Sequence, residues 1–140
     1  MSRLDSFIRR MSAQRDCLNM AVDLIADVPG PILELGLGNG RTYDHLRDLF
    51  PDREIFVFDR RSAAHPDCTP DDDHLFLGDI TETLSAAVVR LVATIAPMVD
   101  ALMAKGGIVC SDQEYTVARW EAQPLPESVR PGRYFVNKVG

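Results

Sequence analysis

A glycine-rich turn between a short apolar run and a helical pattern constrains the fold more than any other feature of this sequence. The run Ile32–Leu35 leads into Gly36, Gly38 and Gly40, and residues 41–50 then carry apolar side chains at helical spacing. Glycines let the backbone turn tightly and let a ligand approach closely, and the following helix directs its free N–H groups at that ligand. The pattern predicts a buried strand, a ligand-binding turn and a helix.

Short apolar runs alternate with helical patterns along the rest of the chain. A helix is expected over the first 28 residues, with Leu4, Phe7, Ile8, Met11, Leu18, Val22 and Ile25 on its inner stripe. Further strands are expected at residues 54–58, 74–77, 108–110 and 133–138, a loop with at most one helical turn at 60–73, and a helix at 82–105 that Pro97 kinks. This alternation favours an α/β fold, a Rossmann-like three-layer sandwich with a mostly parallel sheet.

Residues beyond the carboxyl ends of parallel strands are the first candidates for a ligand site, because ligands bind at that edge of such sheets. The rule selects the glycine turn together with Asp59, Asp79 and Asp112, each just after a predicted strand.

Composition bounds the class of protein. The 140 residues suggest one domain, with an N-terminal helix at 1–28, a core at 31–112 and a C-terminal loop and strand at 113–140. Fifteen basic and 21 acidic side chains give a net charge of −6, which argues against nucleic-acid binding. No apolar run is long enough for a membrane span, and three cysteines outside any CxxC pattern predict reduced thiols in a cytoplasmic protein.

Three glycine motifs compete for residues 34–42. A P-loop fails because Leu35 stands where its first glycine belongs and Arg41 where its lysine belongs. A dinucleotide-binding G-x-G-x-x-G motif is weakened because Arg41 occupies the position of the third glycine, which normally permits close packing of helix and strand. The pattern E-x-G-x-G-x-G matches at every position from Glu34 to Gly40.

Residues 34–40 resemble the first motif of the class I S-adenosylmethionine-dependent methyltransferases. The resemblance continues in order with Asp59 at the end of the second strand, Gly78-Asp79-Ile80 after the third, and an apolar strand after Gly106-Gly107. It covers most of residues 31–112, and the stretches ELGLGNGRTYDHLRDLFP and IFVFDRR are similar to a small bacterial family of these enzymes in particular.

The resemblance implies S-adenosylmethionine as the cofactor. Asp59, 21 positions after Gly38, would accept the ribose hydroxyls, and Asp79 with Ile80 would hold the adenine. Gly36 and Gly38 would flank the methionine portion. The implied cofactor-binding residues are Glu34, Gly36, Gly38, Gly40, Arg41, Thr42, Asp59, Arg60, Asp79 and Ile80.

The expected activity is methyl transfer to a small-molecule acceptor, with no catalytic residue assigned. Asp112, Glu114 and Tyr115 are candidates for a base by position only. Only 25 residues, Thr81 to Lys105, lie where the family usually has helix, strand and helix, so the connection is one long helix, a cramped strand at 91–96, or an abbreviated core. The shortening favours, as an alternative, a non-catalytic S-adenosylmethionine-binding module; a nicotinamide-dinucleotide-binding protein is a weaker one.

Two further features bear on ligands and partners. His65, Cys68, His74 and the acidic residues 71–73 lie close in sequence, but their spacing fits no structural zinc pattern, so no metal is expected. The N-terminal helix carries Arg9, Arg10 and Arg15 beside its apolar stripe, and it serves either as a lid over the site or as a homodimer contact.

Overall fold

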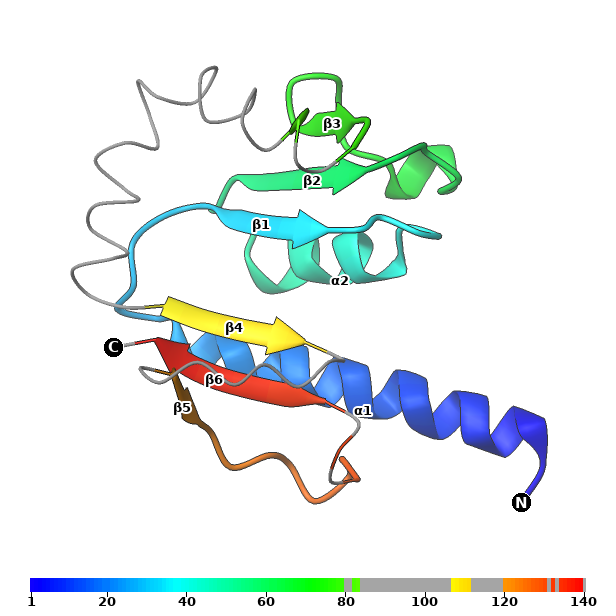
Figure 1. Ribbon diagram of the computed structural model, residues 1–140, viewed down its shortest axis with the longest axis vertical. Coiled ribbons are helices and arrows are strands. Elements are labelled where there is room, and N and C mark those ends of the chain that lie inside the picture. Colours follow the sequence, from blue (N-terminus) through cyan, green and yellow to red (C-terminus); the bar gives the residue numbers. More distant parts are fainter. Residues whose placement is uncertain (80–81, 84–106, 112–119, 131, 133, 140) are drawn as a thin grey trace. The chain divides into compact units, whose positions relative to one another are not determined.

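The computed structural model describes residues 1–79, 82–83, 107–111, 120–130, 132 and 134–139. The chain forms two compact units, a parallel-sheet unit (Gly30–Asp100) and an antiparallel-sheet unit (Met1–Pro29 with Ala101–Gly140). The elements, in chain order, are α1 (Arg3–Leu24), β1 (Ile32–Leu35), α2 (Arg41–Leu49), β2 (Ile55–Asp59), the 3-10 turn η1 (Pro66–Cys68), β3 (Leu75–Leu77), β4 (Gly107–Ser111), β5 (Trp120–Ala122) and β6 (Phe135–Val139) (Figure 1).

The parallel-sheet unit is built on three parallel strands in the order β1-β2-β3. The register pairs Leu35 with Phe58 and Asp59 with Leu77, so the three strands end at one edge. Central strand β2 is buried on both faces, and its Phe58 ring stacks on Phe76 at 4.9 Å between centroids. The strands predicted at 54–58 and 74–77 and the helical turn within 60–73 are confirmed.

The sequence predicted that the apolar residues of strand β1 would be buried, but the structure exposes two of its leucines and buries its glutamate. Leu33 and Leu35 are 47% and 62% exposed, whereas Glu34 between them is only 8% exposed. Successive side chains of a strand point to opposite faces, so burying Glu34 turns both leucines outward.

The antiparallel-sheet unit contains a strand that the sequence did not indicate. Strands β4, β6 and β5 lie side by side in that order, and both pairings are antiparallel. Strand β5 has only three residues and no run of alternating apolar side chains, so it lacked a periodic signal. The final strand occupies Phe135–Val139, shifted toward the carboxyl end from the predicted 133–138.

Helix α1 packs through a different face from the one predicted. It begins with a capping box in which Ser2 Oγ accepts from Asp5 N–H at 3.0 Å. Its buried residues are Ala13, Cys17 and Ala21, and Ala13 and Cys17 share a core cluster with Val129 and Val136. The predicted stripe was wrong at its start, because Leu4, Phe7 and Ile8 are 66%, 41% and 53% exposed.

Several predictions fall on residues outside the described part of the chain. These are the body of the helix expected at 82–105, Ile80, and the base candidates Asp112, Glu114 and Tyr115. Among the helices that the structure describes, none combines the length and apolar character that crossing a bilayer requires.

Candidate functional site

The carboxyl ends of β1, β2 and β3 enclose a cavity of about 290 Å³. The backbone joins the three strand ends, because Gly36 N–H donates to the Phe58 carbonyl at 2.7 Å and Gly78 N–H donates to the Asp59 carbonyl at 2.9 Å. The cavity is lined by Leu35, Gly36, Phe58, Asp59, Arg60, Gly78 and Asp79. Four of these residues, at positions 36, 59, 60 and 79, were predicted from the sequence as cofactor-binding residues.

The Asp59 carboxylate fastens the glycine turn to the end of β2. Its Oδ2 accepts hydrogen bonds from the backbone N–H groups of Leu37 at 2.8 Å and Gly38 at 3.0 Å, and its Oδ1 accepts one from Arg60 N–H at 2.6 Å. The hydrogen bond from Gly38, with the others, lowers the pKa of Asp59 below its ordinary value. The site therefore holds a fixed negative charge beside the turn.

The three glycines of the turn all have positive φ, but they serve different purposes. A Cβ atom on Gly36 (φ 96°) or Gly38 (φ 53°) would meet no described residue within 4 Å, so this part of the chain leaves space beside the backbone at both positions. Gly40 (φ 81°) is the N-cap of α2, and a Cβ there would collide with the Cys68 carbonyl oxygen and lie 2.7 Å from Cys68 Cβ. Gly36 and Gly38 offer room for a ligand, while Gly40 allows the segment that contains Cys68 to pack closely against the turn.

Glu34 places a buried carboxyl group two residues before the glycine turn. Its side chain is 8% exposed, and among the residues that the structure describes its Oε2 has no hydrogen-bond partner. Burial raises the pKa of Glu34 to about 7, so the carboxyl is neutral over much of the acid range. A buried polar atom without a partner is rare in folded proteins and often marks a ligand or catalytic role.

Two helix starts flank the cavity residues. Arg41 and Thr42, both predicted cofactor contacts, form the first turn of α2, where backbone N–H groups are not used within the helix. After β3, the Asp79 carbonyl accepts from Thr83 N–H at 2.8 Å and from Thr83 Oγ1 at 2.9 Å. The ends of β1 and β3 thus both lead into helical turns, as expected for an α/β ligand site.

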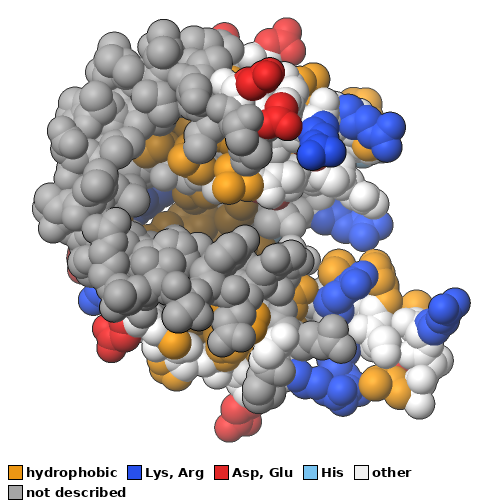
Figure 2. Space-filling model, in the orientation of Figure 1, with side chains coloured by type: hydrophobic (Ala, Val, Ile, Leu, Met, Phe, Trp, Pro, Cys, Tyr) orange, Lys and Arg blue, Asp and Glu red, His pale blue; other side chains and the backbone are white. Residues whose placement is uncertain are grey.

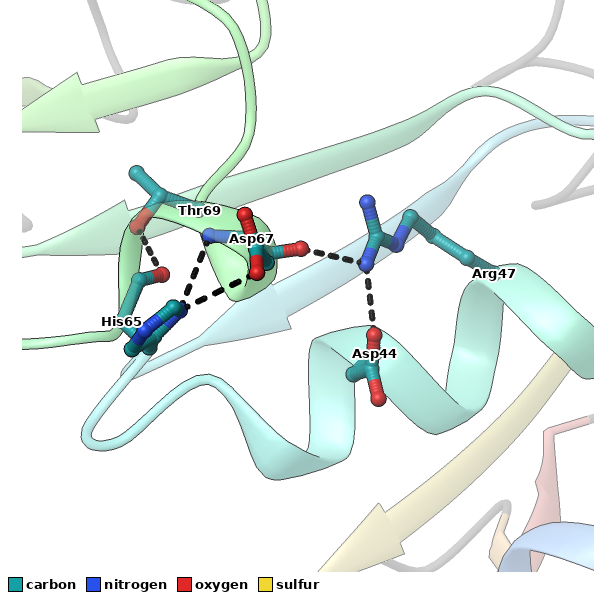
Figure 3. Close-up of polar contacts among 5 residues, drawn as sticks. All are labelled: Asp44, Arg47, His65, Asp67 and Thr69. Carbon is teal, nitrogen blue, oxygen red and sulfur yellow. Dashed lines mark hydrogen bonds and ion pairs between the residues drawn. The ribbon is translucent and has the colours of Figure 1, made fainter.

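The His65–His74 segment uses its polar side chains for structure. His65 Nδ1 accepts from Asp67 N–H at 3.2 Å and caps η1, while Arg47 Nη2 reaches from α2 to the Asp67 carbonyl at 2.7 Å and to Asp44 Oδ1 at 2.5 Å (Figure 3). His74 Nδ1 lies 2.6 Å from Asp71 Oδ1. Within the described ranges, no three His, Cys, Asp or Glu residues are arranged to hold a metal ion.

Three cavity residues were not predicted as site residues. Leu35 is the last residue of β1, Phe58 is the second-last residue of β2, and Gly78 directly follows β3. Their positions at strand ends were the available signal for Leu35 and Phe58, whose apolar side chains carry no chemical motif, and Gly78 was noted only as part of the Gly78-Asp79-Ile80 motif. Arg41 and Thr42 are near in sequence yet do not line the cavity.

Comparison with known proteins identifies the family. The sequence profile of a family described as S-adenosyl-L-methionine methyltransferase matches residues 1–96, which extends the resemblance to the N-terminal helix. The solved S-adenosyl-L-methionine methyl transferase from Silicibacter pomeroyi DSS-3 is 41% identical, with a TM-score of 0.82 over 100% of this chain and 99% of that chain. None of the curated proteins matches this sequence.

The family match decides between the interpretations of the glycine turn. The E-x-G-x-G-x-G motif continues into a parallel α/β sheet, and the structural neighbour has the same Rossmann-like fold. Neither comparison favours the dinucleotide-binding alternative. The chain belongs to the S-adenosyl-L-methionine methyltransferase family, and it is an enzyme that uses S-adenosyl-L-methionine as its methyl donor.

Proposed function

We propose that S-adenosylmethionine binds in the cavity at the carboxyl ends of β1, β2 and β3, and that its methyl group passes to a small-molecule acceptor. The observation that carries this proposal is the Asp59 carboxylate, which lines the cavity and is held there by the backbone of Leu37 and Gly38. A preorganised charge of this kind orients a ligand at little entropic cost.

The described residues fit this cofactor. Among the described residues, Gly36 and Gly38 leave space for a ligand beside the turn. Asp59 is proposed to accept the ribose hydroxyls, and Asp79 to hold the adenine edge, since both line the same cavity. Arg41 and Thr42 are proposed to meet the methionine carboxylate at the start of α2, where the helix dipole favours negative charge.

When bound, S-adenosylmethionine supplies an electrophilic methyl group on a positively charged sulfur. The protein's part is then to align the acceptor with that methyl group and to exclude water. A small-molecule acceptor is proposed because the chain carries a net charge of −6, which opposes binding to nucleic-acid phosphates.

The Asp59→Asn variant tests the cofactor site. Both carboxylate oxygens of Asp59 accept hydrogen bonds from backbone N–H groups, whereas an asparagine amide has only one acceptor oxygen. The NH2 group of asparagine would therefore face a backbone N–H donor, and the substitution also removes the negative charge. We expect the Kd for S-adenosylmethionine, measured by calorimetry, to rise roughly 10- to 150-fold, since hydrogen bonds to charged groups contribute about 1.5–3 kcal/mol.

Asp52→Asn is the matched control, because Asp52 is exposed in the turn before β2, at the opposite end of that strand from Asp59. It should bind the cofactor like the wild type. An Asp59→Asn variant with wild-type affinity would place the cofactor elsewhere, and a wild-type protein that does not bind S-adenosylmethionine would refute the proposal.

The nature of the acceptor is tested separately. The enzyme is incubated with S-adenosylmethionine labelled in its methyl group and with a bacterial extract split by ultrafiltration into small molecules and macromolecules. Enzyme-dependent label in an organic-soluble or ion-exchange-retained product of the small-molecule fraction is expected. Label that appears only in protein or nucleic acid would contradict a small-molecule acceptor.

A further inference from the structure

A second cavity lies entirely within the antiparallel-sheet unit. It has a volume of about 380 Å³, which falls in the range of small-molecule sites. Its walls come from the first half of α1 and from the segment that leads into β6, which are more than 110 positions apart in sequence. Asp16 Oδ2 accepts from Ser128 Oγ at 2.6 Å and fastens the two walls together.

The charge of this cavity is opposite to that of the chain. Arg3, Arg9, Arg10 and Arg130 line it, whereas no aspartate or glutamate is among its described lining residues. Within the described ranges, no carboxylate lies within 4 Å of any of these four guanidinium groups. Figure 2 shows blue basic side chains gathered over the N-terminal part of the molecule's long helix. A concentration of positive charge in a protein of net charge −6 favours an anionic ligand.

The same cavity has an aromatic surface. Phe7 and Tyr134 both line it, and the Arg10 guanidinium lies 5.6 Å from the centre of the Phe7 ring. Tyr134 Oη donates to the Arg10 carbonyl oxygen at 3.4 Å, which holds the tyrosine against α1. Both side chains therefore place an aromatic ring in the wall of the cavity.

We propose that this arginine-lined cavity binds a small organic anion, with a carboxylate or phosphate group paired to the arginines and a flat apolar body packed on Phe7 and Tyr134. Arginine suits this task because its planar fork pairs with both oxyanions and stacks on aromatic rings. The site is independent of the proposed cofactor cavity, and none of its lining residues belongs to that cavity.

The test uses the full chain at pH 8 and four probes: phenyl phosphate, benzoate, inorganic phosphate and benzyl alcohol. Binding is followed by calorimetry for the wild type, for an Arg10→Gln/Arg130→Gln double variant and for Arg61→Gln. Arg61 is the control because it is exposed and belongs to the parallel-sheet unit, and it does not line the cavity.

Phenyl phosphate or benzoate is expected to bind the wild type at least tenfold more tightly than benzyl alcohol. The tighter of these two anions shows whether the site prefers a phosphate or a carboxylate group. The double variant should lose at least tenfold in affinity, while the affinity of Arg61→Gln should stay within twofold of the wild type. The proposal is overturned if neither aromatic anion binds, if the double variant binds like the wild type, or if inorganic phosphate binds as tightly as phenyl phosphate.

The Asp59→Asn variant distinguishes a failure of the anion-site proposal from a failure of the cofactor-site proposal. Asp59 does not line the arginine cavity, so the variant should bind the aromatic anion like the wild type while its affinity for S-adenosylmethionine falls. Loss of anion binding in Asp59→Asn would refute the independence of the two sites.

Discussion

Replacing Gly40 with alanine is expected to destabilise the protein by about 2–5 kcal/mol. The alanine would have to adopt the left-handed backbone conformation of Gly40, and its Cβ would also collide with neighbouring atoms. Gly40 has φ 81° and caps α2, and a Cβ there would overlap the Cys68 carbonyl oxygen and approach Ala64 Cβ to 3.0 Å. Those neighbours cannot move easily, since Arg47 of α2 is hydrogen-bonded to the Asp67 carbonyl of η1.

Gly38→Ala is the comparison that separates the two causes. Gly38 also has positive φ, at 53°, but a Cβ there would meet none of the described residues within 4 Å, so we expect only the conformational cost of about 1–2 kcal/mol. Urea unfolding of both variants measures the difference. A Gly40→Ala protein as stable as Gly38→Ala would show that packing against η1 does not constrain the turn.

The second large effect is on the pH dependence of stability and comes from Glu34. Burial raises the pKa of Glu34 from 4.5 to about 7 in the folded protein. Between these pH values the folded protein holds a proton that the unfolded chain has released, so the free energy of unfolding falls as pH rises. The titration of Glu34 therefore lowers the free energy of unfolding by about 3 kcal/mol in total. This decrease begins near pH 4.5 and is nearly complete above pH 7.

The Glu34→Gln variant removes this titration and keeps the shape of the side chain. The stability of Glu34→Gln relative to the wild type should therefore increase by about 3 kcal/mol between pH 4 and pH 8, measured by urea unfolding at both pH values. Glu127→Gln, at an exposed position in the antiparallel-sheet unit, serves as the control and should follow the wild type. Parallel pH profiles for Glu34→Gln and the wild type would show that Glu34 ionises as freely in the folded protein as in the unfolded chain.

The glycine turn illustrates what a local motif predicts well. The sequence placed Ile32–Leu35 in a strand, the glycines in a turn and residues 41–50 in a helix, and the structure confirms all three. These features depend on neighbouring residues, since apolar runs, positive-φ glycines and helical spacing are written within about ten positions. The motif did not reveal that Gly40 serves packing against Cys68, because that contact joins residues 28 positions apart.

Helix α1 and strand β1 show where periodicity fails. The large apolar residues at the start of α1 predicted its buried face, yet the helix packs through Ala13, Cys17 and Ala21. Small side chains allow a helix to approach its neighbours closely, and this advantage depends on the partner surface, which includes Val129 and Val136. In β1 the charged residue is buried and its leucine neighbours are exposed.

The sequence by itself determined the α/β class, the glycine turn, the family and the edge of the parallel sheet where a ligand is proposed to bind, because each depends on local patterns and on strand order. Only the tertiary structure decided that Asp59 holds the turn through Leu37 and Gly38, that Glu34 is buried, and that arginines of α1 share a cavity with Arg130. These arrangements bring together residues between 21 and 127 positions apart, or depend on how much water each side chain loses. Neither quantity is encoded in the spacing of residue types along the chain.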